Sequence, residues 1–155
     1  MSLKQNVKNA NEMVNAVCRS MLDYTGSYNQ GMWCVRNPNH TEVHTCNTAF
    51  CIAGFAVAIV HGPKKAWRIE QEKDDSDYRL QGIYYTAREL FGDKSDRYGE
   101  GDEDFHEALS NLFSDESPEG SPGTRAYARS GVQKVRAFQR EWKTRLLNTP
   151  IGGRK

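Results

Sequence analysis

The sequence lacks an apolar run that could cross a bilayer. The uncharged stretch 43–60 comes closest, but its first half is polar, and a spanning helix needs about 20 consecutive apolar residues. The N-terminus also lacks the basic start, apolar segment and small-residue cleavage site of a signal peptide. We therefore expect an intracellular, cytoplasmic protein with no membrane partner.

Other absences narrow the function classes. The chain contains no internal repeat, no Gly-rich phosphate loop and no helix-turn-helix or RNA-binding signature. Its 155 residues, 37% hydrophobic and 26% charged, are those of one ordinary globular domain. We expect a single helical domain over 1–147 and a flexible tail over 148–155.

Acidic residues are scarce at both ends and concentrated in the middle. Residues 1–69 hold seven Lys/Arg and three Asp/Glu, 70–119 hold five and sixteen, and 120–155 hold nine and one. Two interpretations fit this asymmetry. The acidic middle pairs with the basic end inside the fold, or the basic end faces an anionic partner.

Apolar spacing of three and four residues predicts amphipathic helices. In the first, 4–24, the polar positions Asn11, Asn15 and Arg19 should face water. Asp77, Asp102 and Thr124 are suited to cap later helices, whereas 63–77 is mixed and charged, with Trp67 and Ile69 as its apolar anchors. The helices expected are 4–24, 47–60, 77–91, 102–113 and 124–147.

The helix expected over 47–60 is distinctive because it has no polar face in its apolar part. Such a helix is buried on all sides, and Gly62 followed by Pro63 should end it. Before it, the β-prone runs 32–35 and 41–45 flank a turn-forming cluster and suggest a small β-hairpin. The predicted fold class is mainly α: a compact bundle of about five helices around this buried central helix.

Cysteine and histidine are concentrated in one stretch, which has the composition of a zinc site. The spacing argues against zinc, because Cys46 and Cys51 are five apart and no second tight pair follows. We therefore expect no metal and no cofactor, and interpret the cysteines as buried thiols. The stretch contains Cys34, His40, His44, Cys46 and Cys51, and the candidate ligands of a structural zinc module are Cys34, His44, Cys46 and Cys51.

Cys46 also allows a catalytic interpretation. A cysteine at the N-terminus of a buried helix has its thiolate stabilised by the helix dipole. A small cysteine-dependent hydrolase would use Cys46 as nucleophile, with His44, His61 or His106 as base.

The stretch Cys46-Asn47-Thr48-Ala49-Phe50-Cys51-Ile52-Ala53-Gly54-Phe55-Ala56 resembles a Cys-Gly-Thr-x-x-Cys-Ile/Leu-Ala-Gly-aromatic-Ala motif. That motif marks a loose group of small uncharacterised bacterial and phage proteins. Asn47 replaces the usual Gly, and Phe50 replaces a small residue. The resemblance spans roughly 30–115, and only these eleven residues are specific. It implies a small cytosolic protein, phage-encoded and acting on host machinery, and it implies no activity.

The last predicted helix has one basic face. At 100° per residue, five of its seven cations fall within an arc of about 60°, nearly opposite its aromatic face. Guanidinium groups suit forked contacts with phosphate or carboxylate. We therefore expect a non-catalytic binding protein that acts on a host macromolecule or a small anionic ligand, with an anionic macromolecule or an acidic protein as partner. The site residues expected are Arg125, Arg129, Arg136, Arg140 and Lys143.

Overall fold

The chain forms a mainly helical bundle, as the sequence predicts. The computed structural model describes residues 3–28, 34–36, 48–74, 76–77, 80–93, 102–114 and 120–151, with the backbone alone at 34–36 and 48–50. The elements in this part are α1 (Ala10–Asp23), η1 (Thr25–Ser27), β1 (Cys34–Arg36), β2 (Thr48–Phe50), α2 (Ile52–His61), α3 (Pro63–Gln71), α4 (Ile83–Leu90), α6 (Glu103–Phe113) and α7 (Arg125–Leu147). No helix among them is both long and apolar enough to span a membrane.

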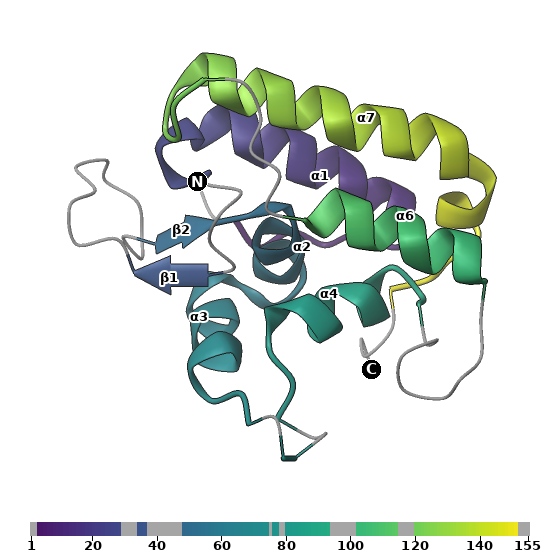
Figure 1. Cartoon of the computed structure of the whole chain (residues 1–155), viewed down its shortest axis with the longest axis horizontal. Helices are drawn as coiled ribbons and strands as arrows, with labels where there is room; N and C mark the ends of the chain where they lie inside the picture. The colour runs from purple at the N-terminus through teal and green to yellow at the C-terminus, as the bar shows by residue number, and fades with distance from the viewer. Residues whose placement is uncertain are drawn as a thin grey trace.

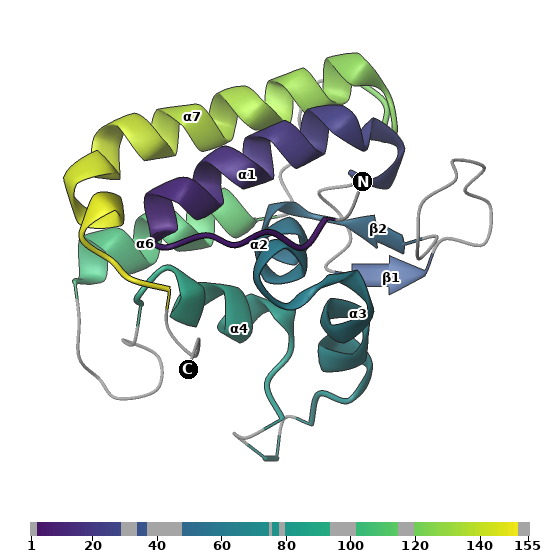
Figure 2. The same cartoon turned by 180° about the vertical axis from the view of Figure 1, so that it is seen from behind.

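Helix α2 lies at the centre of the bundle, and every residue from Ile52 to Val60 is buried. Figure 1 shows α7, α1 and α6 on one side of α2, and α3 and α4 on the other. Figure 2 shows the same arrangement from behind. The prediction of a buried helix is confirmed, because a helix that is apolar on every side can only be accommodated between neighbours. Gly62, at φ 92°, ends α2, and Pro63 begins α3.

The start of α2 differs from the prediction. Residues 48–50, expected to be helical, form β2, which pairs antiparallel with β1 so that Cys34 lies opposite Phe50. The helix begins only after Cys51, whose Sγ accepts a hydrogen bond from the Gly54 amide at 3.4 Å. Periodicity places no boundary within an apolar run, whereas this side-chain cap does. The run 41–45, expected to form a second strand, lies outside the described residues.

The segment after α2 also differs from the prediction. Residues 63–71 form helix α3, with Pro63 in its first turn and Ala66 fully buried. Trp67 and Ile69 do pack against the core as anchors. Asp77 caps no helix, because α4 begins after Gly82 and its Ile83 amide donates to the Glu70 carboxylate at 3.0 Å. A side chain thirteen residues upstream thus replaces the local cap.

Helices α1 and α7 lie side by side and run in opposite directions (Figures 1 and 2). α1 begins at its cap Asn9, rather than at residue 4. The chain after α7 returns along this end: the Ala10 amide donates to Thr149 O at 2.9 Å, and the Ile151 amide donates to Lys8 O at 3.2 Å. A flexible tail was expected from 148, but these hydrogen bonds hold 149–151 against the N-terminal segment; 152–155 lie outside the described residues.

Candidate anion-binding face

Helix α7 begins where the sequence predicts. The Thr124 hydroxyl accepts a hydrogen bond from the Tyr127 amide at 3.3 Å and so caps the helix. One side of α7 is buried against the bundle, and the members of that side include Tyr127, Gly131, Val135, Phe138 and Leu146. Because helical side chains project in all directions, burial of this side leaves the other side of α7 facing solvent.

Four of the five predicted cationic side chains lie on that outer side. They are exposed to solvent, and in the part of the chain that the structure describes none forms an ion pair. Like charges four residues apart on a helix repel one another, as Arg125 and Arg129 do. We call the exposed set of Arg125, Arg129, Arg140 and Lys143 the cationic face.

Arg136, the fifth member, has a different environment. It is half-buried, and its Nη1 donates to Asn15 Oδ1 at 2.6 Å and to Gln139 Oε1 at 2.7 Å. The Gln139 amide in turn donates to Asn11 and Asn15 at 2.9 Å each. These partners are neutral amides, so they position the guanidinium between α1 and α7 without cancelling its charge.

This amide network corrects one prediction. Asn11 and Asn15 were expected to face water, but Asn11 is 9% exposed and Gln139, its partner on α7, is 8% exposed. Buried amides require hydrogen-bond partners, and the two helices supply them to each other. The polar network thereby fixes the register of α1 against α7 and the position of Arg136.

Arg19 is a further exposed cation, on α1. Its Nη2 donates to Gln5 Oε1 at 3.4 Å. Burial raises the pKa of the Cys18 thiol to about 11, and the charges of Arg136 and Arg19 act in the opposite direction. Both guanidinium groups therefore lie near Cys18. The polar face of α1 was the available signal for Arg19, but the sequence alone does not place that face beside α7.

Among the described residues of the acidic segment 93–107, none forms an ion pair with the cationic face. The described ion pair between α7 and this segment is made by Arg145, whose Nη1 lies 3.7 Å from Asp102 Oδ2 and whose guanidinium stacks over the Phe105 ring. Arg145 is on the α6 side of the helix. Asp93, the first acid of the segment, pairs with Arg88 instead.

The cysteines that the structure describes in full are buried thiols. Cys51 is 0% exposed, and burial raises its pKa to about 12. No group of three or more metal-ligating side chains occurs among the described residues. Cys46, His40 and His44 lie outside them, and only the backbone of Cys34 is described. The zinc and hydrolase interpretations therefore remain predictions.

Two of the three histidines considered as catalytic bases are described. Burial, followed by the charges of Lys65 and Lys4, lowers the pKa of His61 at the end of α2. His106 Nδ1 lies 2.9 Å from Asp93 Oδ2 and 2.9 Å from Arg88 Nη1. His106 therefore belongs to a polar cluster between α4 and α6, and Asp93 is engaged by the Arg88 guanidinium as well.

Sequence reasoning missed this cluster. Arg88 is 1% exposed and Asp93 is 5% exposed, and the Arg88 guanidinium also donates to Tyr84, Ser110 and the His106 carbonyl. Gly92 lies between them at φ 80°, and the amides of Gly92 and Asp93 donate back to the carbonyls of Glu89 and Arg88. This turn at the end of α4 brings the Asp93 carboxylate back to the Arg88 guanidinium.

Comparison with protein-family models, with curated proteins and with solved structures finds no significant match to the chain. The resemblance of residues 46–56 to a group of bacterial and phage proteins thus stays a prediction.

The described thiols should be unreactive in the folded protein. We expect Cys18 and Cys51 to resist a maleimide at about pH 8, because both are buried with raised pKa values. Peptide mapping by mass spectrometry after labelling checks this, with labelling in denaturant as the control that both sites can react. Rapid native labelling of Cys51 would contradict its role as a buried helix cap.

Proposed function

We propose that the chain is a non-catalytic binding protein and that the cationic face of α7 binds a macromolecule carrying negative charge. The observation that carries the proposal is the exposure of Arg125, Arg129, Arg140 and Lys143 without an acidic partner in the described part of the chain. Arg136, four residues before Arg140, adds positive charge, and Arg19 on α1 is a further exposed cation.

The shape of the face indicates an extended partner. From Arg125 to Arg140 the helix rises about 22 Å, at 1.5 Å per residue, and Lys143 follows a kink in α7 at Trp142. A row of this length contacts several anionic groups at once, and guanidinium forks suit carboxylates and phosphates. We favour an acidic protein surface over nucleic acid, because the net charge is only +1 and exposed acids of α6 flank α7 on its other side. The motif at 46–56 adds the expectation that this partner belongs to a host cell.

Charge reversal tests the proposal. Arg129→Glu combined with Arg140→Glu should weaken binding to an oligoglutamate peptide by more than about tenfold. At both positions the electrostatic attraction to the peptide, at long range and in contact, becomes repulsion. Wild-type binding should also fall as salt is raised. The melting temperature should stay equal or rise slightly, because repulsion within the pairs 125/129 and 136/140 becomes attraction worth about 0.2–0.5 kcal/mol each.

Lys64→Glu combined with Lys65→Glu is the matched control, since both side chains are exposed on α3 and the change of charge is the same. It should leave most of the peptide binding intact. Equal losses in the two variants would show general charge attraction rather than a site. Tighter binding of a single-stranded oligonucleotide than of the peptide would favour nucleic acid. A large loss of stability on reversal would mean that the face is paired internally.

A further inference from the structure

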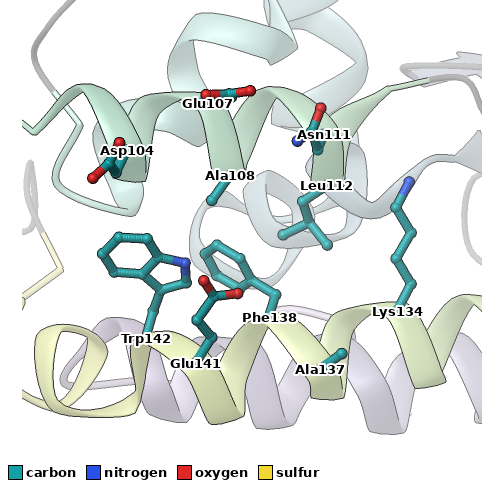
Figure 3. Close-up of a pocket in the computed structure, with 10 residues that line it drawn as sticks. All are labelled: Asp104, Glu107, Ala108, Asn111, Leu112, Lys134, Ala137, Phe138, Glu141 and Trp142. Carbon is teal, nitrogen blue, oxygen red and sulfur yellow. The ribbon is translucent and has the colours of Figure 1, made fainter.

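A groove of about 500 Å³ lies between α6 and α7, on the opposite flank of α7 from the cationic face. Figure 3 shows the side chains that line it: Ala108 and Leu112 of α6 point toward α7, and Phe138 and Trp142 of α7 point toward α6. The groove and the cationic face differ by roughly 160° around the helix. A ligand in the groove therefore need not contact the cationic face.

The floor of the groove is apolar. Leu112 from α6 is 2% exposed and Phe138 from α7 is 7% exposed, and the partly buried indole of Trp142 packs edge-on against the Phe105 ring, with centroids 5.1 Å apart. Apolar side chains surrounded by a polar rim form the arrangement typical of a protein–protein contact.

The rim is mainly acidic. Asp104 and Glu107 from α6 and Glu141 from α7 are exposed, and no ion pair joins them to other described residues. Lys134 lies at the other end of the groove (Figure 3), where its Nζ donates to Ser114 Oγ at 3.5 Å. Three carboxylates against one ammonium leave the groove negative, so electrostatic complementarity favours a cationic occupant.

Trp142 adds a hydrogen-bond donor. Its indole Nε1 is buried and has no acceptor among the described residues, and Figure 3 shows the nitrogen on the side of the indole that faces the middle of the groove. A buried N–H without a partner is destabilising. A ligand with a carbonyl oxygen would satisfy it once the exposed Glu141 side chain moves aside.

We propose that the groove binds an extended segment of a partner protein in which apolar side chains alternate with Lys or Arg. The apolar side chains would cover Phe138 and Trp142, the cations would approach the rim carboxylates, and a backbone carbonyl would accept from Trp142. An extended segment supplies that carbonyl, whereas helix carbonyls are engaged internally. From Lys134 to Trp142 the groove is about 12 Å long, which matches about four extended residues.

A capped peptide of alternating lysine and leucine, about six residues long, is a suitable probe. It should bind saturably and shift one indole N–H resonance of the full-length protein. The chain has three tryptophans, and Trp142→Phe assigns the resonance by removing it. The same peptide with glutamate in place of lysine should not shift it.

Glu107→Gln combined with Glu141→Gln should weaken binding of the lysine–leucine peptide by about tenfold. Ala137→Arg, which adds a cation inside the groove, should weaken it as well. Asp23→Asn combined with Glu72→Gln removes equal charge elsewhere on the surface and should leave binding within about twofold. Four results would each overturn the proposal. They are binding without a shift of the Trp142 resonance, an equal loss of affinity in the control variant, equal binding of the glutamate peptide, and no binding of the lysine–leucine peptide. Oligoglutamate binding to the cationic face should survive in the groove variants, so the two proposals fail independently.

Discussion

Phe55→Asp should abolish cooperative folding. Phe55 lies in the middle of α2, is 0% exposed and contacts the ring of Tyr28, with centroids 6.3 Å apart. A carboxylate there would be buried without a partner, which we expect to cost more than about 4 kcal/mol and thus much of the stability of a domain of this size. Circular dichroism should show no sharp thermal transition, and Ile52→Asp should behave alike.

Two controls separate buried charge from other causes. Phe55→Leu keeps the site apolar and should remain folded, with a loss of about 1–3 kcal/mol. Leu80→Asp introduces the same charge at a side chain that is 43% exposed, and should change the stability by less than about 0.5 kcal/mol. A soluble, cooperatively melting Phe55→Asp protein would show that α2 is not the centre of the core.

The features that could be predicted from the sequence are those with a local cause. Asp102 and Thr124 cap α6 and α7 as expected, since each side-chain oxygen accepts from amides two or three residues ahead. Gly92 and Gly62 both adopt positive φ at helix ends. The buried helix α2 and the basic side of α7 can likewise be predicted from the residue types along a few helical turns.

The features that were missed depend on residues distant in sequence. α4 starts at Ile83 because the Glu70 carboxylate accepts a hydrogen bond from the Ile83 amide. Residues 48–50 form a strand paired with β1 instead of extending α2. Within the candidate site, periodicity gave the right helix face but not the separate role of Arg136, because Asn15 lies 121 positions away. The cluster of Arg88, Asp93 and His106 could not be foreseen from spacing either, since α4 and α6 meet only in the folded chain.

Arg88→Met should be strongly destabilising. The substitution leaves the Asp93 carboxylate 5% exposed without the guanidinium that pairs with it. Removal of one partner of a buried ion pair costs about 3–5 kcal/mol. Asp93→Asn should also destabilise, because Arg88 would keep its charge and lose its anionic partner. Urea denaturation monitored by circular dichroism measures both effects.

The double variant Arg88→Met with Asp93→Asn decides why the single variants lose stability. If the cost comes from an uncompensated buried charge, removing both charges should leave the protein more stable than Arg88→Met alone, with a coupling energy above about 1 kcal/mol. Lys73→Met is the control at a pair whose cation is exposed, since Lys73 is 49% exposed and lies 2.8 Å from Glu70, which is 10% exposed. It should cost less than about 1 kcal/mol. Additive losses in the double variant would instead mean that the Arg88 hydrogen bonds to Tyr84, Ser110 and the His106 carbonyl stabilise the α4–α6 contact independently of Asp93.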